Sequence, residues 1–595
     1  MSTANPPAKG VTREGWRLLV TTLRLQQRQL LTGVAVGLSW TMGKVAVPQL
    51  TKLAIDKGIE KHGSLLFWTL LILAAATVAG IFAAWRRYIA FRESRVTESN
   101  LRERIFAQIQ GLHVGYHDRA QTGQLMSRSS SDLQQVQSFV VNIPIFASQV
   151  TMIVIVVVVL LVMNPTLALI ALAPLPFINI SARSFSHKIH GAVLAVQQEQ
   201  AQLANVVEES VSGIRVIKGF GAEAVQQAKL ETEANDIRTV SMQAARIRAR
   251  FLPAIDLLPS IGLIAVLGFG GHQVVNGTMT LGSLVAFNTY LTMLIWPMRN
   301  IGMTIAMGQR AATALMRVNE ILSAVPEIAD APVPEKLPEA GLARPVGAVR
   351  FDGVRFSYDG ENGAVNVLEG LDWSIEPGES VAVVGATGSG KSTLARLLLR
   401  FYDPQHGTVT LDGVDLRRLR LHDLRRAVGV VFEDTLLFND TVSANIAFAR
   451  PGVDPDVIER AARLAGAHEF VTNLPEGYDT VLGERGFSLS GGQRQRIAIA
   501  RAIVADPRVL VLDDATSAVD PTKEHEIRDA LATVMRNRTT IVIAHRPATI
   551  ELADRVVLLD GGVIAASGTH TGLLASNDRY REVLAAMTEK GGDES

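Results

Sequence analysis

Long apolar stretches without charged side chains dominate the first half of the chain. No Asp, Glu, Lys or Arg occurs at 133–182 or at 257–298, and each stretch is about twice the ~20 residues that a helix needs to cross a bilayer. An Asn-Pro pair at 164–165 interrupts the first stretch and an Asn-Gly pair at 276–277 interrupts the second, where turns are expected. The pattern predicts two helical hairpins in a membrane.

Two further apolar segments lie upstream, joined by a charged loop near 56–61. They bring the expected membrane domain, residues 1–324, to six spans. The expected spans are 30–54, 65–85, 140–163, 166–183, 253–275 and 281–304. Ahead of them, the pattern near 12–28 predicts an amphipathic helix at the cytoplasmic surface of the membrane.

Basic residues gather on one side of the expected spans. They precede span one and follow spans two and four, whereas the short turns at 164–165 and 276–277 carry none. Because basic loops stay on the cytoplasmic side, both termini and the helical extensions near 86–138 and 184–250 are expected in the cytoplasm. The N-terminus has no signal-peptide pattern, so we expect a multi-pass protein of the plasma (inner) membrane.

The second half has a different composition. Four prolines between 326 and 338 mark an extended linker near 325–345. From 346 to 595, short apolar runs alternate with amphipathic segments, which predicts an α/β domain. The mean hydropathy of +0.22 therefore averages a lipid-facing part and a soluble part.

Charge and cysteine content exclude several classes of function. The chain has no cysteine, which excludes disulfides, thiolate metal sites and thiol catalysis. Its net charge of +1 gives no general attraction to nucleic acid. The basic run at 417–426 lacks interleaved aromatic residues and is interpreted as a solvated surface, so no nucleic-acid partner is expected.

A glycine-rich loop in the second half matches a phosphate-binding pattern. A buried strand expected at 381–384 leads into Gly-Ala-Thr-Gly-Ser-Gly-Lys-Ser, which fills G-x-x-x-x-G-K-[ST]. Backbone amides of such a loop wrap phosphates, Lys391 reaches the β- and γ-phosphate oxygens, and Ser392 ligates Mg²⁺. The residues expected to bind ATP here are Gly385, Thr387, Gly388, Ser389, Gly390, Lys391, Ser392 and Thr393.

A second motif indicates which kind of ATP-binding protein this is. The run Leu489-Ser490-Gly491-Gly492-Gln493, followed by a basic helix, resembles the LSGGQ signature of ATP-binding cassette (ABC) proteins. It stands just ahead of the strand expected at 509–513, as it does in the family. The resemblance covers essentially the whole chain, because six spans followed by one cassette are similar to an ABC exporter half-transporter.

The resemblance implies a fold and an assembly. The fold is a multidomain one, an all-α six-helix transmembrane domain with long cytoplasmic helical extensions followed by an α/β P-loop ATPase domain. Two such chains are needed in the bilayer, because the family sandwiches each ATP between one chain's phosphate loop and the other chain's signature. The signature residues that would contact ATP are Ser490, Gly491, Gly492 and Gln493.

Other family elements occur in the expected order. By the resemblance, Tyr358 stacks on adenine, His545 contacts the γ-phosphate, and 517–520 is the D-loop. The run 483–486 resembles a loop that senses the membrane domain. Two segments match the coupling helices of exporters, and they lie at 116–123 and 213–223.

Two residues depart from the family pattern. Asp514 follows the strand-ending Asp513 where the family has a glutamate that orients the attacking water, and Glu433 replaces the glutamine of the Q-loop. Asp514, His545 and Glu433 are thus the candidate catalytic residues. Ser392, Glu433 and Asp513 are the candidate Mg²⁺ ligands. The departures resemble the degenerate-site subunit of heterodimeric bacterial exporters, so a heterodimer is favoured and a slow homodimer stays open.

The expected function is ATP-driven transport, foremost export of a hydrophobic or amphipathic compound or lipid. Two alternatives stay open at this point, a nucleotide-binding regulatory subunit with little hydrolysis of its own and an importer with an exporter-like fold. Lys44 and Asp256 are charges within expected spans, where such groups contact substrate, pair in the bundle or reach the membrane edge. The sequence does not name the transported substrate.

Overall fold

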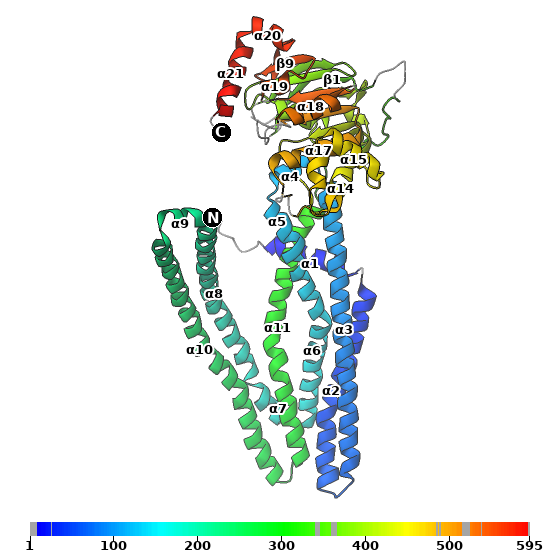
Figure 1. Ribbon diagram of the computed structural model, residues 1–595. Coiled ribbons are helices and arrows are strands. Elements are labelled where there is room, and N and C mark those ends of the chain that lie inside the picture. Colours follow the sequence, from blue (N-terminus) through cyan, green and yellow to red (C-terminus); the bar gives the residue numbers. More distant parts are fainter. Residues whose placement is uncertain are drawn as a thin grey trace. The chain divides into compact units, whose positions relative to one another are not determined.

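The computed structural model consists of two compact units. The first comprises residues 1–110 and 122–324, and the second comprises 111–121 and 325–595. The structure describes residues 9–24, 26–339, 346–358, 366–483, 486, 489–514, 524–536, 538–544 and 546–592. Figure 1 shows the helices and strands of each unit.

The first unit is helical throughout its described residues. Its longest helices are α3 (Leu65–Gly111), α10 (Glu223–Val275), α11 (Leu281–Leu322) and α8 (Leu175–Ser212). The other elements are α1 (Lys9–Arg24), α2 (Gln27–Leu53), η1 (Ala54–Ile59), α5 (Thr122–Ser127), η2 (Arg128–Asp132), α6 (Leu133–Met163), α7 (Pro165–Leu172) and α9 (Ile214–Phe220).

Five helical segments among the described residues are long and apolar enough to cross a membrane. They are Gln27–Ile59, Leu65–Gly111, Thr122–Met163, Glu223–Val275 and Leu281–Leu322. The fourth expected span, 166–183, falls on α7 and the start of α8, which a turn at Ala173-Pro174 separates. The break ahead of it follows from the sequence, because the Asn164 side chain caps α7 by accepting from the Leu167 N–H at 3.0 Å.

Local sequence also sets the other helix boundaries. The expected surface helix ends at Arg24 and the first long helix starts at Gln27, which is earlier than the apolar pattern alone predicts. Helices α8 and α10 run side by side and are joined by α9 (Figure 1). Helix α6 packs against both α2 and α11. A buried contact fixes α11 to α2, because the Tyr290 hydroxyl donates to the Val45 carbonyl oxygen at 2.6 Å.

The second unit contains two β-sheets. The six-stranded sheet has the order β10-β9-β3-β8-β7-β6, parallel from β9 to β6 with β10 antiparallel at one edge. Its strands are β3 (Ser380–Val384), β6 (Val428–Val431), β7 (Val509–Asp513), β8 (Thr539–Ile543), β9 (Arg555–Asp560) and β10 (Val563–Gly568). The antiparallel sheet, β2-β1-β4-β5, consists of β1 (Val349–Phe356), β2 (Leu368–Ile375), β4 (His406–Leu411) and β5 (Val414–Asp415).

Helices and the short segment 111–121 complete the second unit. Four of its helices are α4 (Val114–Arg119), α12 (Lys391–Leu398), α17 (Gly491–Ala505) and α18 (Glu524–Met535). The remaining elements are η3 (Leu416–Arg418), α13 (Leu421–Ala427), α14 (Val442–Ile446), η4 (Ala447–Ala449), α15 (Pro455–Leu464), α16 (His468–Thr472), η5 (Gly477–Asp479), α19 (Pro547–Ile550), α20 (His570–Ser576) and α21 (Asp578–Gly592).

The parallel sheet explains where a nucleotide site can form. Strand β3 is buried at all five positions, as expected for a central parallel strand. Because β3, β8, β7 and β6 are parallel neighbours, the loops after them meet at one edge of the sheet, where α/β proteins bind ligands. The fold class expected from the sequence, a helical domain followed by an α/β P-loop domain, is confirmed.

Candidate nucleotide site

The phosphate loop joins β3 to α12 at the carboxyl edge of the parallel sheet. It turns through two glycines with positive φ, Gly388 at 83° and Gly390 at 103°. At Gly385 a Cβ would lie 2.2 Å from the Leu559 carbonyl oxygen, so a side chain has no room there. A glycine loop that leads into a helix N-terminus presents backbone amides to phosphate groups.

Lys391 is folded back onto this loop. Its ammonium donates to the carbonyl oxygens of Gly385 at 2.8 Å and Ala386 at 3.0 Å. Burial lowers the pKa of Lys391, and nearby carboxylates oppose that shift. The Ser389 hydroxyl is buried and has no hydrogen-bond partner in the described part of the chain. An ammonium with a remaining proton and an unpaired hydroxyl are suitable donors for phosphate oxygens, so these residues fit ATP.

Two adjacent carboxylates end β7. The Asp513 carboxylate accepts a hydrogen bond from the Ser392 hydroxyl at 3.3 Å, which brings together two of the expected Mg²⁺ ligands. Asp514 follows with a φ of 45°, in the left-handed region, which aspartate adopts more readily than most residues other than glycine. Its backbone N–H donates to the Ile543 carbonyl oxygen at 2.9 Å, which ties the end of β7 to β8.

The environment of Asp514 changes its acidity. Burial raises the pKa of Asp514 to about 6, the charge of Glu433 contributes to the shift, and Arg546 opposes it. Glu433 follows β6 and is exposed. The two residues that depart from the family pattern, Asp514 and Glu433, are therefore acidic groups within electrostatic reach of each other.

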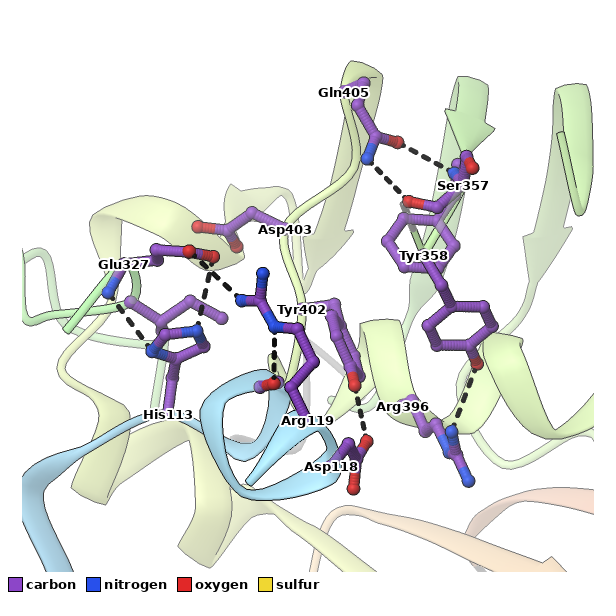
Figure 2. A pocket seen from close by; sticks show the side chains of 13 residues that line it. His113, Asp118, Arg119, Glu327, Ser357, Tyr358, Arg396, Tyr402, Asp403 and Gln405 are labelled. Carbon is purple, nitrogen blue, oxygen red and sulfur yellow. Dashed lines mark hydrogen bonds and ion pairs between the residues drawn. The ribbon is translucent and has the colours of Figure 1, made fainter. Parts of the chain in front are cut away.

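Tyr358 lies among aromatic rings near the start of α12 (Figure 2). Its ring meets Phe356 at 4.9 Å and Tyr402 at 5.2 Å between centroids, both edge to face. Its hydroxyl lies 3.0 Å from the Thr393 hydroxyl, and Arg396 donates to it at 3.3 Å. Tyr358 is partly exposed, so its ring is available to stack on a base.

The segment 111–121 forms one wall of a cavity of about 730 Å³ beside Tyr358 (Figure 2). The Tyr402 hydroxyl donates to Asp118. His113 is linked twice to Glu327: Nε2 lies 3.2 Å from the carboxylate, and Nδ1 accepts the Glu327 backbone N–H at 3.2 Å. Arg119 binds the same carboxylate at 3.2 Å. Hydrogen bonds and ion pairs therefore hold the first expected coupling segment to the ATP domain.

The signature run forms the start of α17. Ser490 is the N-cap, and its hydroxyl accepts the Gln493 backbone N–H at 3.3 Å while the Gln493 side chain accepts the Ser490 N–H at 2.9 Å. Gly491 and Gly492 form the start of the first turn after this capping box. Because they carry no side chains, the positively polarised helix end is not covered there. In the described part of the chain, no hydrogen bond joins this run to the phosphate loop.

Several expected residues lie outside the described residues. These are His545, the D-loop 517–520, and Glu484 and Arg485 of the loop 483–486. The side chain of Asp256 is also outside them. Sequence reasoning missed Tyr402, His113 and Glu327, although the Phe401-Tyr402-Asp403-Pro404 run directly after α12 was a local signal for an aromatic group near Tyr358.

Comparison with known families gives two adjacent matches. The family profile described as the ABC transporter transmembrane region matches residues 30–298, and the profile described as ABC transporter matches residues 368–517. The two matches occur in one polypeptide in the order expected from the sequence.

Individual relatives agree with these matches. The ATP-dependent lipid A-core flippase of Syntrophus aciditrophicus is 35% identical over 570 residues, 94% of this chain and 92% of the relative. A multidrug efflux ATP-binding/permease protein of Mycobacterium tuberculosis is 37% identical over 579 residues, which are 97% of this chain. The chain spans 48% of that relative's length and 48% of its Mycobacterium bovis counterpart.

A solved structure has a similar fold. The structure of a bacterial Atm1-family ABC exporter with ATP bound superimposes with a TM-score of 0.75 at 29% sequence identity. The superposition covers 95% of this chain and 98% of that chain.

Proposed function

Because this chain belongs to the ABC transporter family, as an exporter half-transporter with its membrane region and ATPase domain in one polypeptide, we propose that it exports an amphipathic compound or lipid. ABC exporters hydrolyse ATP to drive transport and act as dimers of half-transporters in a lipid bilayer. The names of the relatives, lipid A-core flippase and multidrug efflux protein, support an amphipathic cargo.

The proposed ATP site uses residues from two chains. Gly385 to Thr393 hold the phosphates, with Tyr358 against adenine, and His545 contacts the γ-phosphate. Ser392, Asp513 and Glu433 hold Mg²⁺, which would neutralise phosphate charge and fix the β/γ geometry. Ser490 to Gln493 complete the site on the partner's phosphate loop. The contact between the Ser392 hydroxyl and Asp513 supports this arrangement.

One observation carries the proposal that this chain's own ATP site is slow. Asp514 occupies the position after Asp513 where the family has glutamate, and aspartate is one methylene shorter. A misplacement of about 1 Å at the reacting water can cost on the order of a hundredfold, or about 2.7 kcal/mol. Burial, with a contribution from the charge of Glu433, raises the pKa of Asp514 to about 6, which still leaves the carboxylate mostly ionised near pH 7. The slow-site proposal therefore rests on the shorter reach of aspartate and not on its acidity.

A slow site in one chain favours a partner with a competent site. We therefore assign this chain to a heterodimer in which its signature completes the fast site on the partner. A homodimer with two slow sites is the second arrangement, since aspartate retains part of the geometry. In either arrangement the protein lies in the plasma (inner) membrane with both termini in the cytoplasm, as the distribution of basic residues supports.

Two other roles remain distinct from this proposal. In the first, ATP stays bound in this chain over many cycles and the subunit mainly regulates its partner, a role that the shorter side chain of Asp514 favours. In the second, an exporter-like fold imports its cargo. Vesicles whose ATP domains face outward distinguish import from export. When ATP is added, an exporter moves a labelled amphiphile into the vesicle, and an importer moves it out.

The test is the ATPase rate of the purified chain alone in lipid nanodiscs, with Asp514→Glu measured beside it. We expect the wild type near background and a gain on the order of tenfold or more for the glutamate variant. Asp513→Glu is the matched control, since it lengthens the adjacent carboxylate and should give no gain. Wild-type turnover of about 1 to 10 per second, which is common among enzymes, would refute the slow-site proposal.

A further inference from the structure

Two cations share one tryptophan in the membrane unit. The Arg86 guanidinium of α3 lies 4.1 Å from the centre of the Trp40 ring of α2, and the Lys44 ammonium lies 5.6 Å from the same ring. Trp40 and Lys44 are one helical turn apart on α2, so they share a helix face. The arrangement concentrates positive charge around a single indole.

Arg86 is buried without hydrogen-bond partners for two of its nitrogens. The residue is 5% exposed, and its Nε and Nη1 bind no group among the residues that the structure describes. It reaches the contact between α2 and α6, because a Cβ at Gly37 would lie 3.1 Å from the Arg86 Cδ and 2.0 Å from the Ser148 hydroxyl. The Ser148 hydroxyl itself donates to the Pro144 carbonyl oxygen at 2.6 Å.

The neighbouring helices provide no compensating negative charge. No Asp or Glu occurs at 27–53, 65–92, 133–163 or 281–309. The next acid on α3, Glu93, is two turns away and lies 3.9 Å from Arg92. In the described part of the chain, no ion pair involves Arg86 or Lys44.

Magnitudes show that the indole alone does not balance these charges. A cation–π contact in a desolvated site contributes about 2 kcal/mol. An arginine or lysine within the hydrocarbon costs at most about 2.5 to 3.5 kcal/mol on insertion scales, the value at the helix centre, and Arg86 also buries two guanidinium nitrogens without partners among the described residues. One ring shared by two cations therefore leaves guanidinium donors unsatisfied, and an anion would satisfy them.

The depth of the cluster suits a lipid-like anion. Arg86 is 21 residues after the start of α3, or about 32 Å along the helix, close to the ~30 Å thickness of the hydrocarbon core. On the orientation proposed above, span two puts Arg86 at the cytoplasmic boundary of the hydrocarbon, and span one puts Trp40 about 15 Å inside it. The cluster therefore lies in the cytoplasmic half of the membrane, on the side of the inner-leaflet headgroups. Lys44 is exposed, so it can contact such a headgroup directly.

We propose that Trp40, Lys44 and Arg86 form a receptor for the acidic headgroup, phosphate or carboxylate, of the exported amphiphile. The inference rests on the proposed export function and specifies its substrate class. Lys44 contacts the headgroup, and Arg86 supplies uncompensated charge from behind the indole. Neutral and cationic amphiphiles lack the charge that this cluster requires.

The test uses the full chain in phosphatidylcholine nanodiscs without nucleotide. Dioctanoyl phosphatidic acid and dodecanoate are the phosphate and carboxylate probes, and dodecyltrimethylammonium is the cationic comparison. Binding is read from tryptophan fluorescence, with Trp40→Phe identifying the signal from this ring. We expect a saturable Trp40-dependent change with at least one acidic probe and none with the cation, and the better acidic probe identifies the headgroup chemistry.

Variants then assign the charge. Arg86→Gln should weaken acidic-probe binding about tenfold or more, whereas Arg87→Gln, an exposed neighbour with the same loss of charge, should change it less than twofold. If Arg86→Gln fails to fold, Lys44→Gln takes its place in the test. Lys44 is exposed, so its replacement should not disturb folding, and it should also weaken acidic-probe binding. Equal effects of Arg86→Gln and Arg87→Gln, or no Trp40-dependent signal, would overturn the proposal.

Asp256 is the alternative source of negative charge. If Asp256 were the counter-ion of this cluster, the single variants Arg86→Asp and Asp256→Arg would each lose folding and probe-independent fluorescence. The double variant, which exchanges the two charges, would restore both. That outcome would overturn the proposal. Because binding is read without ATP, failure of this inference is distinguishable from failure of the export proposal, which the ATPase and vesicle measurements test.

Discussion

The Tyr402 hydroxyl donates a hydrogen bond to the Asp118 carboxylate, and the Tyr402 ring packs edge to face on Tyr358. One side chain thus contacts both the aromatic residue proposed to stack on adenine and the first expected coupling segment (Figure 2). Gly115 permits this contact, because a Cβ there would lie 2.9 Å from the Tyr402 ring.

Tyr402→Phe should loosen the segment 113–119 and leave the aromatic cluster intact. A hydrogen bond to a charged group contributes about 1.5 to 3 kcal/mol, and partial exposure of this pair places the effect at the lower end. We expect backbone amides of 114–119 to exchange with deuterium about tenfold faster, measured by mass spectrometry. Tyr88→Phe, at an exposed position, is the control and should change nothing there. Unchanged exchange in Tyr402→Phe would show that the hydrogen bond does not hold the segment.

Gly385→Ala should lower the affinity for nucleotide much more than Gly388→Ala does. The new Cβ at 385 would lie 2.2 Å from a backbone carbonyl oxygen and 2.6 Å from the Ser389 hydroxyl, whereas the Cβ at 388 would have no atom within 4 Å. At 388 only the cost of a positive φ remains, about 1 kcal/mol. We expect affinity for a fluorescent ATP analogue to fall more than a hundredfold for Gly385→Ala and about tenfold or less for Gly388→Ala. Equal losses would contradict this account of the loop.

Asp514→Asn should make the ATP-free protein less sensitive to pH between about 4 and 6. The pKa of Asp514 is raised from 3.8 to about 6 in the folded protein, so the folded state binds this proton more tightly than the unfolded state. The associated stability is fully present below pH 3.8 and is lost as pH rises to about 6. The wild type should therefore lose part of its thermal stability over this window relative to the variant, as measured by Tm in nanodiscs. If the Tm of the wild type and of Asp514→Asn changed with pH in the same way, the pKa of Asp514 would not be raised by folding.

Ser490→Ala should remove the N-cap of α17. Loss of a serine cap costs about 1 kcal/mol, which corresponds to roughly 2 to 4 °C in Tm for a domain of this size. Ser490→Thr preserves the hydroxyl and should restore most of the loss. If both variants have the wild-type Tm yet inhibit ATP hydrolysis in the assembled dimer, the serine acts only on the partner's nucleotide and not on the helix.

The sequence predicted the parts of the site that depend on local order along the chain. The glycine loop, its lysine and the strand-ending Asp513 follow from a contiguous motif or from an apolar run with a polar end, and the parallel sheet brings them to one edge. The capping box of Ser490 and Gln493 likewise lies within four residues.

Contacts between distant segments could not be predicted in this way. Asp118 and Tyr402 are separated by 284 positions, and His113 and Glu327 by 214, so no local pattern links them. The stacking of Arg86 on Trp40 also depends on how α2 and α3 pack. The sequence indicates a basic residue after span two and gives no sign that its guanidinium is buried.

The nucleotide retained by this chain tests the central claim most directly. The wild-type chain in nanodiscs would be loaded with Mg-ATP, freed of excess nucleotide after several minutes and quenched in acid, and the bound ATP and ADP would be separated by chromatography. A slow site predicts that most of the retained nucleotide is ATP, and that Asp514→Glu shifts it to ADP. Predominantly ADP on the wild-type chain, with phosphate released at rates common among exporters, would contradict the account.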